Sequence, residues 1–94
     1  MERPKIYTEF IPRLAELFIK EPSSLEILLM LSDEGPKTIE QIEIIYDTKM
    51  TDLLDKLKLL QVIDIKNGLV NITSFGRYIV RKLRKEVRKN KKDV

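Results

Sequence analysis

Residues 47–63 of the chain, DTKMTDLLDKLKLLQVI, carry an apolar repeat that is typical of one amphipathic helix. Intervals of three and four residues place the apolar side chains on a single face, which is expected to be buried. Asp47 or Thr48 is suited to cap this helix, because a short side chain with an oxygen atom accepts a hydrogen bond from a free backbone N–H. We therefore predict a helix over residues 48–61. The inward face is expected to consist of Met50, Leu53, Leu54, Leu57, Leu60 and Gln61.

A tight β-hairpin is expected directly after this helix. Residues 62–66, VIDIK, and residues 69–73, LVNIT, are rich in β-branched side chains and are separated by Asn67-Gly68. Asn-Gly between two such runs is the strongest short hairpin signal, because both residues adopt positive φ angles at low cost. The sequence predicts a two-stranded hairpin over residues 62–73. Leu59 of the preceding helix is expected to pack under the hairpin.

Two helices are predicted near the N-terminus. The first covers residues 9–20, with Pro12 in its opening turn, where the missing N–H of proline costs no hydrogen bond. The second covers residues 24–33 and is capped by Ser23 or Ser24. Its apolar side chains point in nearly all directions, so most of this helix is expected to be buried.

Capping residues also mark the third helix and the last one. In Thr38-Ile39-Glu40-Gln41 the threonine and the glutamine can satisfy each other's backbone donors, which is a capping box. It predicts a short helix over residues 38–46. Thr73-Ser74 is expected to cap a final helix over residues 74–89, and residues 90–94 have nothing to bury and are expected to be frayed.

The composition excludes several classes of protein. The 94 residues correspond to one domain, and they include no cysteine and no histidine, so disulfides, thiolate or imidazole catalysis and the usual zinc sites are absent. We find no cluster of carboxylates, no nucleophile with its base and no glycine-rich phosphate loop, so we expect no enzyme, no metal and no cofactor.

The same composition bears on location and source. No run approaches 18 uncharged apolar residues, and the N-terminus has no signal-peptide pattern, so a cytoplasmic or nucleoid-associated protein without a membrane partner is expected. Twelve isoleucines, abundant lysine and glutamate and the lack of cysteine are typical of hyperthermophile proteins and favour an archaeal source.

Charge is divided unevenly along the chain. The formal net charge is +3, yet residues 1–76 hold nine basic and thirteen acidic residues, whereas residues 77–94 hold nine basic and two acidic ones. In the last predicted helix an apolar stripe of Phe75, Ile79, Leu83 and Val87 is flanked by Tyr78 and Val80. The opposite face carries Arg77, Arg81, Arg84, Lys85 and Arg88.

The predicted order of elements is three helices, a turn, a fourth helix, a two-stranded hairpin and a last helix, and it resembles a winged helix-turn-helix domain. Residues 38–76 resemble the small archaeal and bacterial winged-helix regulators of the MarR and ArsR kind. The resemblance rests on Ile39 and Ile42, on residues 54–57 before Val62-Ile63, and on residues 72–76, ITSFG. The basic last helix is similar to that of crenarchaeal nucleoid-associated winged-helix proteins, which dimerise through it. The resemblance implies a mainly α, single winged-helix domain over residues 1–94.

The resemblance also implies how the chain would bind double-stranded DNA. Residues 48–61 would be the recognition helix in the major groove, with the hairpin as a wing on the adjacent backbone. On that helix Asp52 would be repelled by phosphates unless it accepts a hydrogen bond from a cytosine amino group. Such families often have glycine just before the wing, where this chain has Gln61. The implied DNA contacts are Thr38, Thr48, Lys49, Thr51, Asp52, Lys56, Lys66, Asn67, Arg77, Arg81, Arg84, Lys85 and Arg88.

These patterns lead to a first hypothesis, a DNA-binding transcriptional regulator or architectural chromatin protein. Nine positive charges within sixteen residues repel one another unless an anion is near. Such a run is also compatible with a solvated face of the helix. It attracts RNA as well as DNA. The apolar stripe of the last helix extends beyond what one small body covers, which favours a homodimer. Its interface would comprise Phe75, Tyr78, Ile79, Leu83 and Val87.

A second hypothesis is a protein-docking winged helix. The acidic body, with Asp47, Asp52 and Asp55, would then contact a basic surface of a transcription or replication protein. Replacing Lys49 and Lys56 with alanine separates the two hypotheses, since it should reduce DNA binding only under the first.

Overall fold

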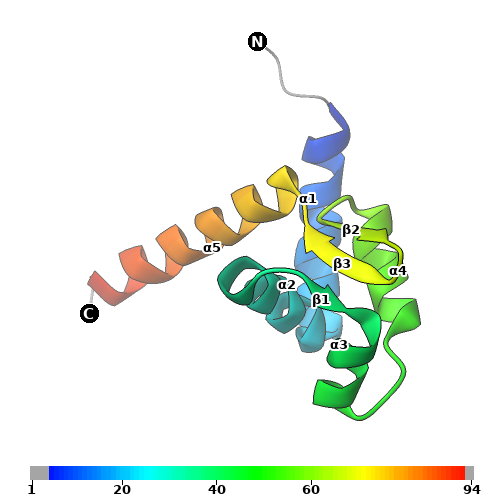
Figure 1. Ribbon diagram of the computed structural model, residues 1–94. Coiled ribbons are helices and arrows are strands. Elements are labelled where there is room, and N and C mark those ends of the chain that lie inside the picture. The colour runs from blue at the N-terminus through cyan, green and yellow to red at the C-terminus, as the bar shows by residue number, and fades with distance from the viewer. Residues whose placement is uncertain (1–4, 93–94) are drawn as a thin grey trace.

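The computed structural model describes the backbone of residues 5–92 and the side chains of residues 8–86, and it is shown in Figure 1. The described chain is mainly α, with five helices and a small antiparallel sheet of three strands in the order β1-β3-β2. Along the chain the elements are α1 (Lys5–Lys20), α2 (Pro22–Glu34), β1 (Lys37–Thr38), α3 (Ile39–Tyr46), α4 (Thr51–Leu59), β2 (Ile63–Lys66), β3 (Leu69–Ile72) and α5 (Ser74–Lys92).

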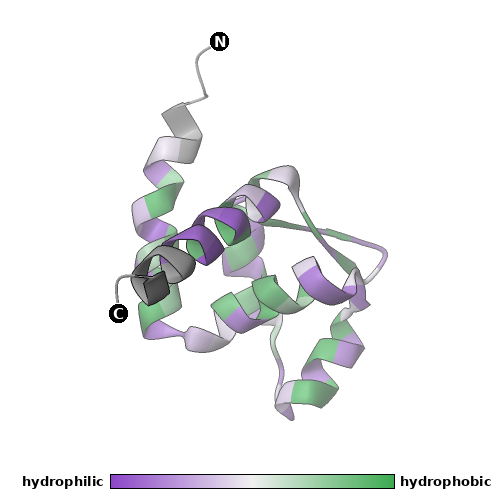
Figure 2. Ribbon diagram, turned by 90° about the vertical axis from the view of Figure 1, so that its left-hand side faces the viewer, coloured by the Kyte–Doolittle hydropathy of each residue, from purple (hydrophilic) through white to green (hydrophobic). Residues whose placement is uncertain are grey.

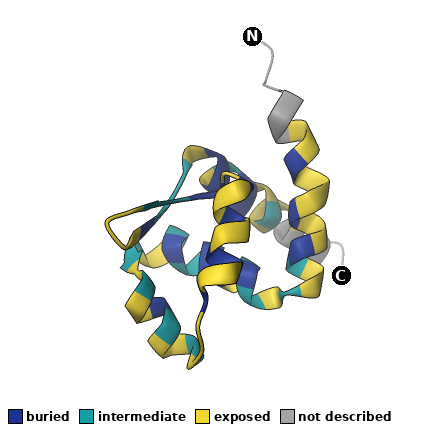
Figure 3. Ribbon diagram, turned by 90° about the vertical axis from the view of Figure 1, so that its right-hand side faces the viewer, coloured by how far each residue is buried: buried dark blue, intermediate teal, exposed yellow. Residues whose placement is uncertain are grey.

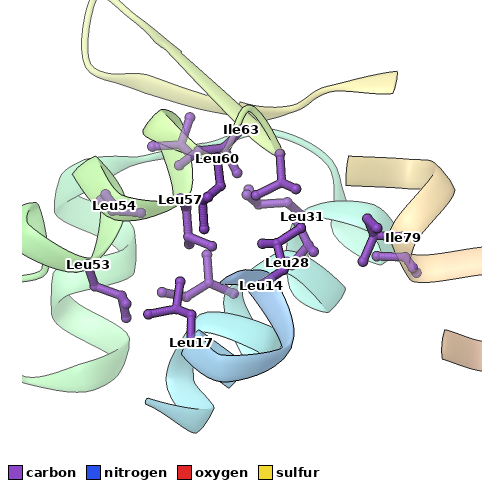
Figure 4. Close-up of a cluster of buried hydrophobic side chains, with 14 of the residues drawn as sticks. Leu14, Leu17, Leu28, Leu31, Leu53, Leu54, Leu57, Leu60, Ile63 and Ile79 are labelled. Atoms are coloured by element: carbon purple, nitrogen blue, oxygen red, sulfur yellow. The ribbon is translucent and has the colours of Figure 1, made fainter. Parts of the chain in front are cut away.

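A single apolar core joins the helices to the hairpin. Leu14 of α1 and Leu28 of α2 are fully buried, and they face Leu57 of α4 across the centre of the molecule (Figure 4). Each such leucine contributes about 2 kcal/mol through the removal of its side chain from water. Ile63 of β2 and Val70 of β3 close the core from the side of the sheet.

The predicted helix over residues 48–61 is shorter in the structure, where α4 covers Thr51–Leu59. Neither predicted capping residue caps it: Asp47 ends α3 in the left-handed conformation with φ of 52°, and Met50 takes the N-cap position of α4. The five predicted inward residues that are apolar are buried, whereas Gln61 is exposed. Leu59 is 76% exposed, so the prediction that it packs under the hairpin is wrong, because position 59 lies on the outer face of α4.

The predicted hairpin is confirmed, with β2 and β3 paired antiparallel. Asn67 and Gly68 have φ angles of 52° and 77°, which are the positive values that a type I′ turn requires. A third strand was not predicted: β1 pairs with β3, so that Lys37 lies opposite Val70. Two residues are too few to show any periodicity, which is why the sequence predicted only two strands.

The N-terminal helices begin earlier than predicted. Because α1 begins at Lys5, Pro12 lies inside the helix on its exposed side, and not in the first turn. Pro22 is the first residue of α2, a position for which the fixed φ of proline is suited. Glu21 is the N-cap residue without a side-chain cap, and Ser24 instead donates a hydrogen bond of 2.7 Å to the Glu21 carbonyl.

The other two predicted caps are present. In the capping box of α3 the Thr38 N–H donates to Gln41 Oε1 at 2.9 Å and the Gln41 N–H donates to Thr38 Oγ1 at 3.1 Å. Thr73 Oγ1 accepts a hydrogen bond from the Gly76 N–H at 3.0 Å at the start of α5. The helix continues to Lys92, past the predicted end at residue 89, and residues 93–94 of the segment predicted to be frayed lie outside the described residues.

None of the helices within residues 5–92 combines the length and the apolar character that a membrane span needs.

Candidate nucleic-acid interface

The orientation of α5 is set by its apolar face. Phe75, Ile79 and Val80 are buried in the core of the same chain. At Gly76 the helix approaches the residue before β2 so closely that a Cβ atom would overlap the Val62 carbonyl oxygen. With this face held against the body, the opposite face of α5 is directed to solvent, and Figure 2 shows it as a largely hydrophilic ribbon.

The solvent face of α5 is strongly basic. Arg77, Arg81 and Lys85 are exposed and recur every four residues, so they form one row along the helix. Arg84 is exposed on the same side of the helix, and Lys82 is exposed beside the row. Within residues 74–92 the sequence contains a single acidic residue, Glu86. We call Arg77, Arg81, Arg84 and Lys85 the basic row of α5, and Arg88, predicted to continue it, has a side chain outside the described range.

One member of the basic row is paired. Arg84 Nη2 lies 2.6 Å from Asp33 Oδ1, and the two side chains are about half exposed. An exposed ion pair of this kind contributes little to stability. It links α5 to the last turn of α2 and leaves Arg77, Arg81 and Lys85 without an ion-pair partner among the described side chains.

The predicted contacts on α4 and on the loop before it are all exposed. Their surroundings are acidic, since residues 39–60 hold five acidic and three basic residues. Asp52 and Asp55 point to solvent, and Lys56 Nζ is 2.8 Å from Glu21 Oε2 on the neighbouring segment. The field in front of α4 therefore disfavours phosphate.

The tip of the hairpin presents Lys66 and Asn67, which are exposed as predicted. The positive charge of Lys66 is partly offset by Asp64, whose carboxylate is 3.8 Å away. Thr38 uses its side-chain oxygen in the cap of α3. Next to it, Lys37 of β1 pairs with Glu34 at 3.0 Å, so the third strand adds no unpaired charge.

The two groups of predicted DNA contacts lie on different parts of the molecule. In Figure 1 α4 and the distal part of α5 are at opposite sides of the body, and Figure 3, viewed from the side of α4, shows the exposed outer face of α4 toward the viewer. The structure therefore separates the basic row of α5 from the predicted contacts Thr48, Lys49, Thr51, Asp52 and Lys56.

The residues of the predicted dimer interface contact the body of their own chain to different extents. Phe75 and Ile79 are 6% and 7% exposed within one chain, because they fill the core between α5 and the rest of the body. Tyr78 and Leu83 are partly buried against the same core, and the Tyr78 ring stacks on Phe75 at a centroid distance of 6.4 Å. The side chain of Val87 lies outside the described range.

Two perturbed sites, at Tyr46 and at Glu16 with Lys20, lie away from the basic row. Burial, together with a hydrogen bond of 3.0 Å from Tyr46 Oη to Glu26, raises the pKa of Tyr46 to about 12. The hydrogen bond between Lys20 and Glu16 at the end of α1 lowers the pKa of Glu16 and raises that of Lys20. In the described part of the chain no three acidic side chains come together as a metal site.

Comparisons of the chain with models of protein families, with curated proteins and with solved structures find no match.

Proposed function

We propose that the chain is a winged-helix protein that binds double-stranded DNA chiefly through the phosphates, as an architectural or regulatory protein. The order of the helices and the position of the hairpin between α4 and α5 support the winged-helix interpretation. The capped α3, the following α4 and the Asn67-Gly68 turn are the features that such a domain needs.

The observation that carries the proposal is the basic row of α5. Its charges lie opposite the face that docks on the core, so folding directs them outward. From Arg77 to Lys85 the row spans about 12 Å at the rise of an α-helix. Duplex DNA carries one charge per about 1.7 Å along its axis, so a row of this length meets several phosphates.

The binding proposed here is mainly electrostatic. Arginine and lysine contacts to phosphate release condensed counterions, which makes affinity fall with salt and depend little on sequence. The hairpin tip with Lys66 and Asn67 would add backbone contacts. Lys56 would add less, because its charge is already paired with Glu21.

A second candidate function is docking to another protein through α4. The observation in its favour is the outward orientation of Asp52 and Asp55, which suits a basic protein surface better than a phosphate backbone. Under this alternative the basic row of α5 would give only secondary affinity for nucleic acid.

The test compares two double variants in fluorescence anisotropy on a random-sequence duplex at low salt. Reversing the basic row with R81E/K85E should weaken binding by at least about tenfold, which corresponds to about 1.4 kcal/mol. The matched pair K49E/K56E on the α4 side, which changes the net charge by the same amount, should weaken it by much less. If only K49E/K56E weakens binding, α4 is the DNA contact and the role given to α5 is wrong. If the wild-type protein does not bind at low salt, the docking function takes its place.

A further inference from the structure

The outer side of α3 carries two isoleucines that the body of the chain leaves largely uncovered. Ile44 is 78% exposed and Ile45 is 56% exposed. Within residues 39–46, all of which the structure describes, Ile42 is the one buried residue and points the other way, into the core. In Figure 1 α3 lies at the lower edge of the body, away from the distal part of α5. We call Ile44 and Ile45 the apolar face of α3.

Folding alone does not account for isoleucine at these two positions. A β-branched side chain loses rotamer freedom in a helix, so alanine, lysine or glutamate stabilises an exposed helical position better. Ile44 and Ile45 also gain little from burial, because each keeps more than half of its surface in water. Contact with another molecule accounts for them better than the stability of the chain does.

Acidic side chains surround the apolar face of α3. Residues 39–48 contain three acidic residues and no basic one. Glu40 and Asp47 have no ion-pair partner among the described side chains, and Glu43 uses one carboxylate oxygen to accept the Met50 N–H. An open hollow of about 510 Å³ beside the helix is lined by Glu40, Glu43, Ile44, Asp47, Thr48 and Lys49. Its lining therefore holds three carboxylates and a single ammonium group.

The C-terminal end of α3 strengthens this negative field. Asp47 is the C-cap residue of α3. At that end of a helix the backbone carbonyls carry a partial charge of about −0.5, which disfavours a carboxylate and favours a cation. A lysine or arginine of a partner placed here would be stabilised by the Asp47 side chain and by the helix end together.

We propose that the apolar face of α3 docks a basic amphipathic helix of another protein. Apolar side chains of the partner would pack on Ile44 and Ile45, as in other surfaces that bind amphipathic helices. Lysine or arginine side chains on either side would face Glu40 and Asp47, which gives the contact its charge complementarity. The eight residues of α3 span about 12 Å, which matches two turns of a partner helix. A surface of this size supports a reversible contact.

This docking surface is separate from the surfaces discussed above. The basic row lies on α5, and Asp52 and Asp55, which carry the alternative docking function, lie on α4. With α5 on DNA and α3 on a partner, the chain would hold a second protein at the DNA. The proposal for α3 does not rest on DNA binding, so either can fail alone.

The test is a titration of the isotope-labelled full chain with a synthetic peptide, followed by the NMR chemical shifts of the backbone amides. The peptide has a leucine stripe flanked by lysines and about 18 residues, because shorter isolated helices are marginal in water. A peptide of the same composition in scrambled order lacks the stripe and is the control. The stripe peptide should cause saturable shifts centred on residues 40–48, and the scrambled peptide should bind at least about tenfold more weakly.

The double variant I44A/I45A tests the apolar face. It should raise the dissociation constant of the stripe peptide by at least about tenfold, while alanine keeps the helix intact. The matched control I11A/I19A removes two exposed isoleucines of α1 and should leave peptide binding unchanged. I44A/I45A should bind random-sequence DNA as the wild type does, and circular dichroism checks that both variants keep their helices.

A second pair of variants tests the charges. E40Q/D47N should weaken peptide binding by at least about threefold at low salt and by less at high salt, where screening reduces the attraction. D52N/D55N on α4 removes the same charge and should have a smaller effect. Equal effects of the two pairs, or shifts centred on α4, would overturn the role of α3.

Three further results would also overturn the proposal. Equal binding of the stripe and scrambled peptides would mean that charge alone attracts them. Binding that I44A/I45A leaves unchanged would mean that the apolar face of α3 is not the anchor. Shifts of residues 40–48 that depend on protein concentration without peptide would assign this face to a second copy of the chain.

Discussion

Glu43 Oε2 accepts a hydrogen bond of 3.0 Å from the Met50 N–H, so a side chain of α3 satisfies a backbone donor just before the first turn of α4. The bond holds the turn between the two helices, whereas α4 has no side-chain cap of the kind that Asp47 or Thr48 was predicted to supply. Asp47 instead adopts the left-handed conformation that ends α3.

Replacing Glu43 with alanine should lower the free energy of unfolding by about 1 kcal/mol, the usual net contribution of one hydrogen bond. Glu43→Gln keeps an acceptor oxygen and should cost less. Glu40→Ala, at an exposed position of the same helix, is the control and should have little effect. Urea denaturation measures all three, and equal losses for Glu40→Ala and Glu43→Ala would show that the bond does not stabilise the turn.

Gly76→Ala should destabilise the chain by more than about 2 kcal/mol, although alanine normally favours a helix over glycine. The reason is the overlap of the new Cβ with the Val62 carbonyl, which forces α5 away from the start of β2. Ser74→Ala, at an exposed position in the same helical turn, is the matched control. A neutral or stabilising effect of Gly76→Ala in thermal unfolding would mean that α5 does not pack so closely.

Gln61→Gly should raise the free energy of unfolding by about 1 kcal/mol. Gln61 has a φ of 62°, in the left-handed region where a side chain is strained and glycine is not. Asn67→Gly is a useful comparison, since Asn67 has a φ of 52° but asparagine tolerates this conformation, and a smaller gain is expected. Chemical denaturation of both variants measures the two changes in the free energy of unfolding. A loss of stability in Gln61→Gly would contradict the predicted relief of strain.

Stability should fall at alkaline pH because of Tyr46. Burial and the hydrogen bond to Glu26 raise its pKa to about 12, whereas the tyrosine of an unfolded chain titrates near 10. The stabilisation is therefore fully present below pH 10 and is lost between about pH 10 and 12. Tyr46→Phe cannot ionise, so its stability relative to the wild type should improve across this range. Thermal melts of both proteins at pH 8 and pH 11 test this. The same difference in Tm between Tyr46→Phe and the wild type at both pH values would contradict the prediction.

The sequence predicts the elements of this fold well where local physics controls them. The threonine caps at Thr38 and Thr73 and the Asn67-Gly68 turn follow from short-range preferences, and the structure has them. The prediction from sequence fails where a contact with residues far away in the chain determines the local structure. Only the paired strand β3 makes Lys37-Thr38 a strand.

The site is predictable to a smaller extent. The basic character of α5 is visible in the sequence, but the separation of α5 from α4 depends on how the helices pack. Periodicity marks Phe75 and Ile79 as apolar without telling whether their own chain or a second copy covers them. The ion pair of Lys56 with Glu21 joins residues 35 positions apart, which no local pattern reveals.

The most direct test of the proposed role of α5 is a salt titration of the wild-type chain on a random-sequence duplex. Binding is followed by fluorescence anisotropy. If about four basic side chains contact phosphates, the logarithm of the binding constant should fall with the logarithm of salt concentration with a slope of about −3.6. Binding should be similar on unrelated sequences. Absence of binding at low salt, or an affinity that hardly changes with salt, would contradict phosphate recognition by the basic row of α5.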